Sequence, residues 1–217
     1  MAIIEQLSPG VINKIAAGEV IERPASLLKE LMENGVDAGA TRVDVTVEKG
    51  GGQLVRVTDD GHGIAPDQLP LAVASHATSK LRTADDLYRV STLGFRGEAL
   101  ASIGAVSRLV VRSRPHDSQT GGQIEVVGGR MEGVVPSGGP AGTTVEVREI
   151  FFNTPVRRKF LRTSQTEMSH CTEAFTRIAL ACPHVHFTLT HNGRMLYELP
   201  PTDDWRDRIG RFFGTDL

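Results

Sequence analysis

Few cysteines and no long apolar run occur in this sequence of 217 residues. Its two cysteines, Cys171 and Cys182, provide no disulfide framework, which favours a reducing compartment. No apolar stretch approaches the roughly 18 residues that span a bilayer, so we expect no membrane segment. The first residues also lack a basic region followed by a long apolar core, which predicts a cytoplasmic protein without a secretion signal.

A strong excess of charge of one sign is absent as well. The 24 basic and 26 acidic residues give a net charge of −2, so no overall field favours nucleic acid or acidic lipid. The hydrophobic fraction of 40% and the charged fraction of 23% are those of a globular protein and exclude a disordered, collagen-like or coiled-coil chain. The length predicts one large domain, or one domain and part of another.

The spacing of apolar residues predicts helices and strands joined by short connections. Val43, Val45 and Val47, for example, alternate with polar residues, as in a strand of a half-buried sheet. Helices are expected at 8–17, 24–38, 98–103 and 164–182, with another starting near 203, and strands at 42–48, 54–58, 106–113, 122–127, 130–135, 143–149, 185–190 and 195–199. This order predicts an α+β fold, a two-layer sandwich of a mainly antiparallel mixed sheet with helices on one face.

One polar stripe on the helix expected at 24–38 has the residue types of a reactive site. At 100° per residue, Glu30, Asn34 and Asp37 fall within roughly 60° of one another, beside the apolar stripe of the same helix. A carboxylate there could deprotonate a water, and an amide oxygen is a hard ligand for Mg²⁺. Taken alone, the same spacing is more typical of a solvated helix face.

Three glycine-containing segments could bind a flat or phosphorylated ligand. Asp59 to Ile64 follows a strand, and its glycines allow close backbone approach while an aspartate accepts a hydrogen bond. Leu93 to Leu100 opens a helix, where backbone N–H groups suit phosphates. Gly142-Thr-Thr144 enters a later strand. Taken alone, the first two segments are more typical of ordinary turns, and the third carries almost no signal.

Longer strings of residues accompany these segments. They are Ile15–Val20, Glu22–Ser26, Lys29–Leu31, Asp37–Arg42, His76–Lys80, Gly94–Ile103, Phe152–Pro155 and Arg157–Leu161. With them, the chain resembles the N-terminal ATPase domain of the MutL family of DNA mismatch-repair proteins over essentially all of residues 1–217. That family belongs to the GHKL superfamily of ATPases, together with type II topoisomerases, heat-shock chaperones and sensor histidine kinases.

The resemblance implies a role for individual residues of an ATP–Mg²⁺ site. Glu30 would be the general base that activates water, Asn34 the Mg²⁺ ligand, and Asp59 the residue that reads the adenine amino group. Gly63 would leave room for the ring, and Thr143 would support the contact of Asp59. Further nucleotide-binding positions are Asp37, Ala38, Gly61 and Ile64, the lid residues Thr78, Ser79 and Lys80, and the phosphate-binding turn with Leu93, Gly94, Phe95, Arg96, Gly97, Glu98, Ala99 and Leu100.

The resemblance also implies a function. ATP–Mg²⁺ would close the lid and drive homodimerisation through the N-terminal segment with Ile3, Ile4, Leu7, Val11 and Ile12. The dimer would coordinate a MutS-type mismatch sensor, a repair nuclease and a helicase on DNA, in a bacterial-type cytoplasm at the nucleoid. Two alternatives stay open: a nucleotide-gated interaction module with negligible hydrolysis, and another member of the superfamily, such as a type II topoisomerase ATPase subunit.

The resemblance divides the chain at residue 200. Residues 1–200 would form the ATP-binding domain, and 201–217 a linker and the start of a second, transducer-like domain. In the family that second domain supplies a lysine to the terminal phosphate, so we expect weak hydrolysis from residues 1–217 alone.

Two residues depart from the family pattern. Gly35 stands where a small polar residue is frequent, and a glycine inside a helix costs up to ~1 kcal/mol relative to alanine, so we expect it to loosen the helix end beside Asn34. Asp60 stands where asparagine is usual, and we expect its charge beside the adenine pocket.

Two further clusters have competing interpretations. Cys171, Cys182, His184 and His186 have a metal-like composition, but on one unbroken helix the cysteines would lie ~16 Å apart and could not share a zinc ion. Arg157, Arg158, Lys159 and Arg162 form a basic cluster, which indicates either a solvated face or part of a DNA-facing surface.

Overall fold

The computed structural model describes residues 17–18, 20–78, 80, 92–94 and 97–214. The helix expected at 8–17 lies almost entirely outside these residues, and the N-terminal segment expected to join two copies of the chain lies wholly outside them. The helices are α2 (Pro24–Asp37), α3 (Leu69–Ala72), α4 (Ala99–Val106), α5 (Pro155–Phe160), α6 (Ser164–Ala181) and α7 (Trp205–Phe213), with 3₁₀ turns η1 (Lys49–Gly51) and η2 (Pro66–Gln68). The strands are β1 (Arg42–Glu48), β2 (Leu54–Asp59), β3 (Arg108–Arg114), β4 (Gly121–Val127), β5 (Arg130–Met131), β6 (Val135–Ser137), β7 (Gly142–Arg148), β8 (His186–His191) and β9 (Arg194–Leu199).

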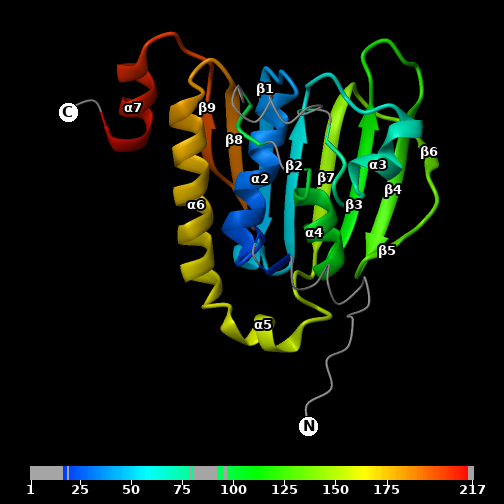
Figure 1. Ribbon diagram of the computed structural model, residues 1–217. Helices are drawn as coiled ribbons and strands as arrows, with labels where there is room; N and C mark the ends of the chain where they lie inside the picture. Colours follow the sequence, from blue (N-terminus) through cyan, green and yellow to red (C-terminus); the bar gives the residue numbers. More distant parts are fainter. Residues whose placement is uncertain (1–16, 19, 79, 81–91, 95–96, 215–217) are drawn as a thin grey trace, which may run out of the picture.

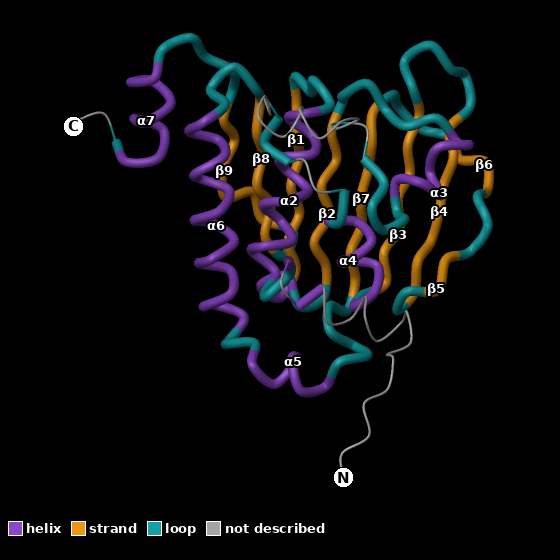
Figure 2. The backbone as a smooth tube through the Cα atoms, in the orientation of Figure 1, coloured by secondary structure: helices purple, strands orange, loops and turns teal. Residues whose placement is uncertain are grey.

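The strands form one sheet with helices on one face (Figure 1). The strand order is β5-β4-β3-β7-β2-β1-β8-β9, and β6 pairs with β4. Every pairing is antiparallel except that of β1 with β8. The parallel pair needs a long crossover between its strands, and α6 lies directly before β8 (Figure 2). The predicted α+β sandwich with a mainly antiparallel mixed sheet is confirmed.

The core lies between the sheet and its helices. Val43, Val45 and Val47 of β1 are buried, while the residues between them face the open side of the sheet. On the helix side, α2 contributes Leu28 and Met32, both fully buried. At the other end, Phe175 of α6 packs edge-on against Phe187 of β8, with ring centroids 6.1 Å apart. The alternating pattern of β1 therefore assigned Val43, Val45 and Val47 to the buried face correctly.

The α7 helix is attached to this core by one buried arginine. The side chain of Arg208 is fully buried and donates hydrogen bonds to four backbone carbonyls, those of Ala179, Pro183, Val185 and Pro200. In addition, the rings of Phe212 and Tyr197 lie 5.2 Å apart. Because a buried charge is costly without polar partners, these four carbonyls fix the position of α7 against the end of α6.

Most predicted elements are confirmed, and a few differ. The single strand expected at 130–135 is two short strands, β5 and β6, at the sheet edge. Helix α5 was not predicted, and α4 extends to Val106, beyond the expected end. The expectation that Gly35 loosens its helix is wrong, because α2 continues to Asp37 and the Ala38 N–H donates to the Asn34 carbonyl.

Candidate functional site

Helix α2 presents the predicted polar stripe along the edge of its buried face. Glu30, Asn34 and Asp37 are each partly exposed, whereas Leu27 and Leu31 on the adjoining face are buried. The Glu30 carboxylate lies 3.5 Å from the ammonium of Lys29, which is itself bonded to Glu33. The helix therefore carries a base candidate and an amide ligand candidate one turn apart, as the sequence predicted.

Gly35 has a packing role in this arrangement. A Cβ atom at Gly35 would lie 3.2 Å from the Cβ of Asp59 and 3.4 Å from Cγ2 of Val43. The absence of a side chain therefore allows α2 to lie close to the end of β2. This contact brings the helix that carries Asn34 to the strand that carries Asp59.

Asp59 is a buried carboxylate at the end of β2. Only 9% of the residue is exposed, and its Oδ1 accepts a hydrogen bond from the Gly61 N–H at 3.0 Å. Burial raises the pKa of Asp59 to about 6, although the backbone amides of Gly61 and Thr143 favour the charged form. The desolvated carboxylate has acceptor capacity left for an amine or amide donor of a ligand.

The loop after Asp59 is fixed by backbone contacts on both sides. The His62 N–H donates to the Ala38 carbonyl, and a Cβ on Gly61 would lie 2.7 Å from the Cβ of Ala38. Gly63 has φ +73°, and a Cβ there would lie 2.3 Å from the Arg114 carbonyl oxygen. The close approach of β3 thus accounts for Gly63 without reference to a ligand. The predicted residues Ala38, Asp59, Gly61 and Gly63 are brought together.

Ser113 of β3 is a site residue that the sequence reasoning missed. Its hydroxyl accepts from the Ile64 N–H at 2.7 Å, donates to the Gly142 carbonyl, and lies 2.8 Å from Oγ1 of Thr143. It thereby joins the loop after Asp59 to β7. The available signal was its place in β3, where the alternation puts a polar side chain on the buried face after Leu109 and Val111.

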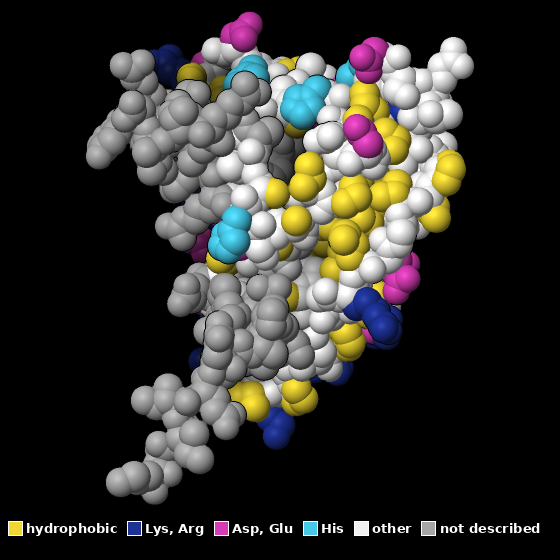
Figure 3. Space-filling view, turned by 45° about the vertical axis from the view of Figure 1, so that its right-hand side comes forward, with side chains coloured by type: hydrophobic (Ala, Val, Ile, Leu, Met, Phe, Trp, Pro, Cys, Tyr) yellow, Lys and Arg dark blue, Asp and Glu magenta, His cyan; other side chains and the backbone are white. Residues whose placement is uncertain are grey.

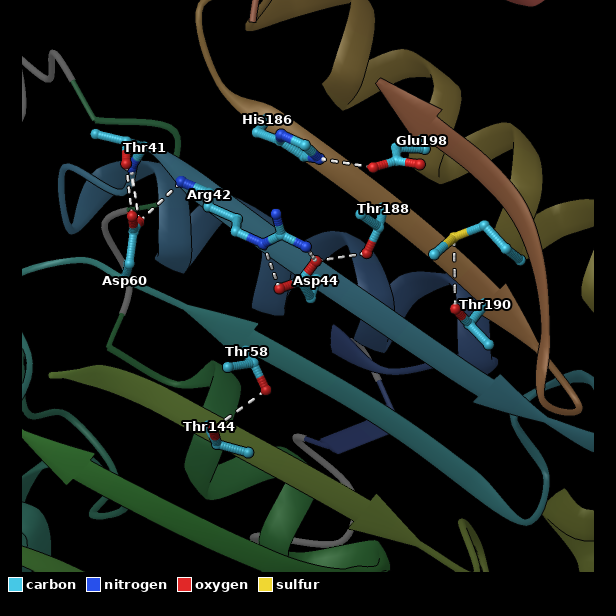
Figure 4. A network of polar contacts seen from close by, with 11 residues as sticks. Thr41, Arg42, Asp44, Thr58, Asp60, Thr144, His186, Thr188, Thr190 and Glu198 are labelled. Carbon is cyan, nitrogen blue, oxygen red and sulfur yellow. Dashed lines mark hydrogen bonds and ion pairs between the residues drawn. The ribbon is translucent and has the colours of Figure 1, made fainter. Parts of the chain in front are cut away.

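The Asp60 side chain points toward Thr41 and Arg42 at the start of β1 (Figure 4). Its carboxylate accepts hydrogen bonds from the Thr41 N–H, the Thr41 hydroxyl and the Arg42 N–H at 2.5–2.8 Å. Burial alone would raise the pKa of Asp60, but these bonds hold it below its ordinary value. Asp60 is therefore a structural cap on β1, and its charge contributes to the raised pKa of Asp59.

Asp37 and Lys80 join α2 to the predicted phosphate-binding turn. The Asp37 carboxylate accepts from the Leu93 N–H at 2.9 Å and the Gly94 N–H at 3.1 Å. The Lys80 ammonium lies 2.5 Å from Oδ2 of Asp37 and 3.0 Å from Oδ1 of Asn34. Five predicted site residues therefore form one connected group.

The start of α4 is tied to the segment before Lys80. Oε1 of Glu98 accepts from the His76 N–H at 2.9 Å and lies 2.5 Å from the His76 ring. Gly97 has φ +63°, and a Cβ there would lie 2.4 Å from the Ala77 carbonyl oxygen. Thr78 accepts from the Lys80 N–H, and Ala99 and Leu100 form the first turn of α4. Ser79, Phe95 and Arg96 lie outside the described residues.

The basic cluster near α5 and the cysteine–histidine cluster were the two groups with competing interpretations. Arg157 lies over the Phe151 ring at 4.2 Å and donates to the Ile21 carbonyl, so it anchors α5 instead of belonging to a surface cluster. Arg158, Lys159 and Arg162 are exposed. Cys171 is buried on α6, and burial raises the pKa of its thiol to about 12. Within the described ranges, no three or more His, Cys, Asp and Glu side chains form a group that could hold a metal ion.

Comparison with known proteins identifies the family. A family model described as "Histidine kinase-, DNA gyrase B-, and HSP90-like ATPase" matches residues 22–128, which include α2, β1, β2 and α4. The MutL ATPase domain of Aquifex aeolicus, solved in complex with ADP, is 38% identical in sequence and has a TM-score of 0.72. That match covers 90% of this chain and 70% of the Aquifex chain. The chain belongs to the MutL family.

Curated members of the MutL family are also similar over nearly the whole chain. The DNA mismatch repair protein MutL of Xanthomonas oryzae is 55% identical over 99% of this chain, and that of Azotobacter vinelandii is 56% identical over 97%. The chain spans about a third of the length of these relatives, 34% and 33%. Membership of the MutL family confirms the predicted GHKL fold and sets aside the topoisomerase subunit as an alternative. No helix among the described residues is long and apolar enough to cross a membrane.

Proposed function

We propose that this chain is the ATP-binding and ATP-hydrolysing domain of a DNA mismatch-repair protein. One observation carries the proposal: α2 contacts both a buried carboxylate and a pair of backbone donors. Its Gly35 lies against Asp59, and its Asp37 accepts hydrogen bonds from the N–H groups of Leu93 and Gly94, which are donors that could bind a phosphate. These groups match the two ends of a nucleotide: an amine-bearing base and a chain of phosphates. The ADP complex of the Aquifex aeolicus domain supports the same ligand class.

The chemistry of the donor set supports a divalent cation at Asn34. Its amide oxygen accepts a hydrogen bond from the ammonium of Lys80, and Asp37 adds a carboxylate beside it, which supports a cation at this position. A Mg²⁺ ion held by Asn34 would neutralise charge on the phosphate oxygens. We propose Asn34 as the protein ligand of that ion.

The remaining roles follow from the position of each group on the chain. Asp59 would accept a hydrogen bond from the adenine amino group, with Thr143 and Gly63 shaping the pocket around it. Leu93, Gly94 and the first turn of α4 would donate backbone N–H groups to the phosphates. Glu30, one helical turn before Asn34, would accept the proton of the attacking water.

The wider function is proposed on the basis of family membership. ATP would draw Thr78, Ser79 and Lys80 over the nucleotide, and the N-terminal segment would join two copies of the chain. The dimer would coordinate a MutS-type sensor, a nuclease and a helicase on DNA in the cytoplasm. On the face in Figure 3, the Lys and Arg side chains of the described residues are scattered. Because the net charge of the chain is −2, we expect DNA binding by this chain alone to be weak and salt-sensitive.

We also propose the division of the chain at residue 200. Residues 1–200 would form the ATP-binding domain, and 201–217 a linker and the first helix of a second domain. The hydrogen bonds of Arg208 would hold this first helix, α7, against the end of α6 in the ATP-binding domain.

The experiment that tests the enzymatic role compares wild type with Glu30→Ala. We expect steady-state ATP hydrolysis to fall by a factor of ~10² or more, because the general base is lost, while the Kd for a non-hydrolysable ATP analogue stays within about twofold. Glu173→Ala, at an exposed position on α6, is the matched control and should hydrolyse ATP like wild type.

The same measurement separates the alternative. Equal hydrolysis rates in wild type and Glu30→Ala, with nucleotide bound by both, would favour a nucleotide-gated interaction module. Failure of wild type to bind any adenine nucleotide would refute both functions.

A further inference from the structure

Asp37 and Lys80 are bonded to the groups that the proposed function assigns to the nucleotide and its metal ion. The Asp37 carboxylate accepts hydrogen bonds from two N–H groups of the proposed phosphate-binding turn, those of Leu93 and Gly94. The Lys80 ammonium lies on the Asn34 amide oxygen, the proposed ligand of Mg²⁺, and bridges to Asp37. Only 6% of the Asp37 side chain and 21% of the Lys80 side chain are exposed, so water screens this pair weakly.

The three polar groups converge on the backbone of Gly94. A Cβ atom at Gly94 would lie 3.3 Å from Nζ of Lys80 and 3.8 Å from Oδ1 of Asn34 and Oδ2 of Asp37. The glycine therefore leaves open the place in which the ammonium and the two oxygens meet. The Asp37 carboxylate therefore binds the turn at Leu93 and Gly94, and the Lys80 ammonium binds Asn34.

We propose that Asp37 and Lys80 are an internal substitute for the nucleotide and its metal ion. In the nucleotide-free protein, the Asp37 carboxylate stands in place of a phosphate oxygen, and the Lys80 ammonium stands in place of Mg²⁺. Binding of Mg²⁺–nucleotide exchanges both: phosphate replaces Asp37 on the amides of Leu93 and Gly94, and Mg²⁺ displaces Lys80 from Asn34. This inference rests on the proposed function, because it concerns the regulation of the same site.

The exchange has a physical reason. Two backbone N–H groups at a helix entrance and an amide oxygen would otherwise lack partners in a partly buried site. The internal pair satisfies them without a ligand and keeps the turn in its binding conformation. Because nucleotide binding must break the contacts of that pair, their free energy weakens nucleotide binding by the same amount. Lys80 and Mg²⁺ consequently compete for Asn34.

The first test measures the Mg²⁺ dependence of ADP binding in wild type and Lys80→Met. If Lys80 competes for Asn34, the Mg²⁺ concentration that gives half-maximal ADP binding falls by about fivefold in the variant, which corresponds to a contact of about 1 kcal/mol. Lys49→Met, at an exposed lysine of the β1–β2 turn, should leave this concentration unchanged. An unchanged or higher concentration in Lys80→Met would overturn the proposal, since Lys80 would then not oppose the metal.

The second test needs no catalysis and compares the stability of Asp37→Asn, Lys80→Met and the double variant by urea denaturation. The coupling between the two positions should be measurable in nucleotide-free protein and lost when Mg²⁺–ADP is saturating. The Arg42–Asp44 pair on the open face is the matched control, and its coupling should be the same in both conditions. A coupling at Asp37–Lys80 that is absent without nucleotide, or equal with and without it, would overturn the exchange.

These outcomes separate the exchange from the proposed function. Wild type that binds no adenine nucleotide would refute the function. The exchange alone would be refuted if wild type binds ADP with Mg²⁺ while Lys80→Met has the metal dependence of wild type and the Asp37–Lys80 coupling is the same with and without nucleotide.

Discussion

At the scale of the residue, Asp59 is a buried carboxylate whose charged form is unfavourable for the fold that carries it. Its raised pKa, about 6 against an ordinary 3.8, reports the cost of keeping a carboxylate out of water at the end of β2. Between pH ~4 and ~6 the folded protein holds a proton that the unfolded chain has released. The contribution of this group to stability therefore decreases as the pH rises through that window, and the charged form opposes folding above it.

Asp59→Asn should therefore separate stability from binding. We expect the Kd for ADP to rise at least about tenfold at pH 7.5, because a charged acceptor of the adenine amino group is lost. The free energy of unfolding should rise by up to about 3 kcal/mol above pH 6, where the buried charge no longer has to be desolvated. Calorimetric titration and urea denaturation at pH 5 and 7.5 measure the two effects.

A second aspartate provides the control for this change. Asp44 on the open face is bonded to Arg42 and Thr188, and its pKa is lowered by these bonds although burial opposes them (Figure 4). Asp44→Asn should bind ADP as wild type does. Unaltered ADP binding by Asp59→Asn would contradict the assignment of Asp59 to the adenine.

At the scale of the element, the loop between β2 and η2 is held by contacts that allow no extra atom. Gly61 meets Ala38 at the end of α2, and Gly63 meets the Arg114 carbonyl of β3. Glycine is therefore required at both positions, because the neighbouring elements leave no room for a side chain. A loop held by such contacts would need little reordering to bind a ligand.

Gly63→Ala tests this steric account against Gly193→Ala. Both glycines have a left-handed backbone, φ +73° and +78°, but a Cβ at Gly193 meets nothing within 4 Å. Each change should cost ~1 kcal/mol for the backbone conformation, and Gly63→Ala about 2 kcal/mol more for overlap with Arg114. Urea denaturation of the two variants measures the difference, and equal losses of stability would contradict the contact.

At the scale of the whole molecule, the sheet separates a helical side with the site from an open side with charge pairs. On the open side, Glu146 lies 3.0 Å from Arg112 and 2.9 Å from Arg148. These pairs hold the pKa of Glu146 below its ordinary value, although burial opposes them. The elements of the proposed site all belong to the helical side or to the loops at its edge.

Nucleotide should change the association state of the whole chain. We expect size-exclusion chromatography to show a monomer without nucleotide and a dimer with Mg²⁺ and a non-hydrolysable ATP analogue, because binding energy would stabilise the dimer-competent conformation. Asp59→Asn should stay monomeric at the same analogue concentration, whereas Asp44→Asn should dimerise. A wild type that binds the analogue and stays monomeric would contradict nucleotide-driven dimerisation.

Local pattern determined most of the elements and part of the site. The alternation in β1, the proline and apolar spacing of α2 and the Asn-Gly turn before β9 are properties of neighbouring residues, so they can be read without the fold. The polar stripe with Glu30 and Asn34 follows from helical spacing in the same way. The short α5 was missed because its six residues carry too few turns to display a period.

Only the tertiary structure decided which groups meet across long stretches of chain. Asp37 and Gly94 are 57 positions apart. Neither spacing nor composition predicts that a carboxylate of α2 accepts hydrogen bonds from the turn at Leu93 and Gly94. Ser113 and Arg157 likewise acquire their roles from distant partners, the loop at Ile64 and the carbonyl of Ile21. The sequence by itself determines which residues can lie on one face, because that depends on local geometry. The fold decides which faces touch, because that depends on packing and on the pairing of buried polar groups.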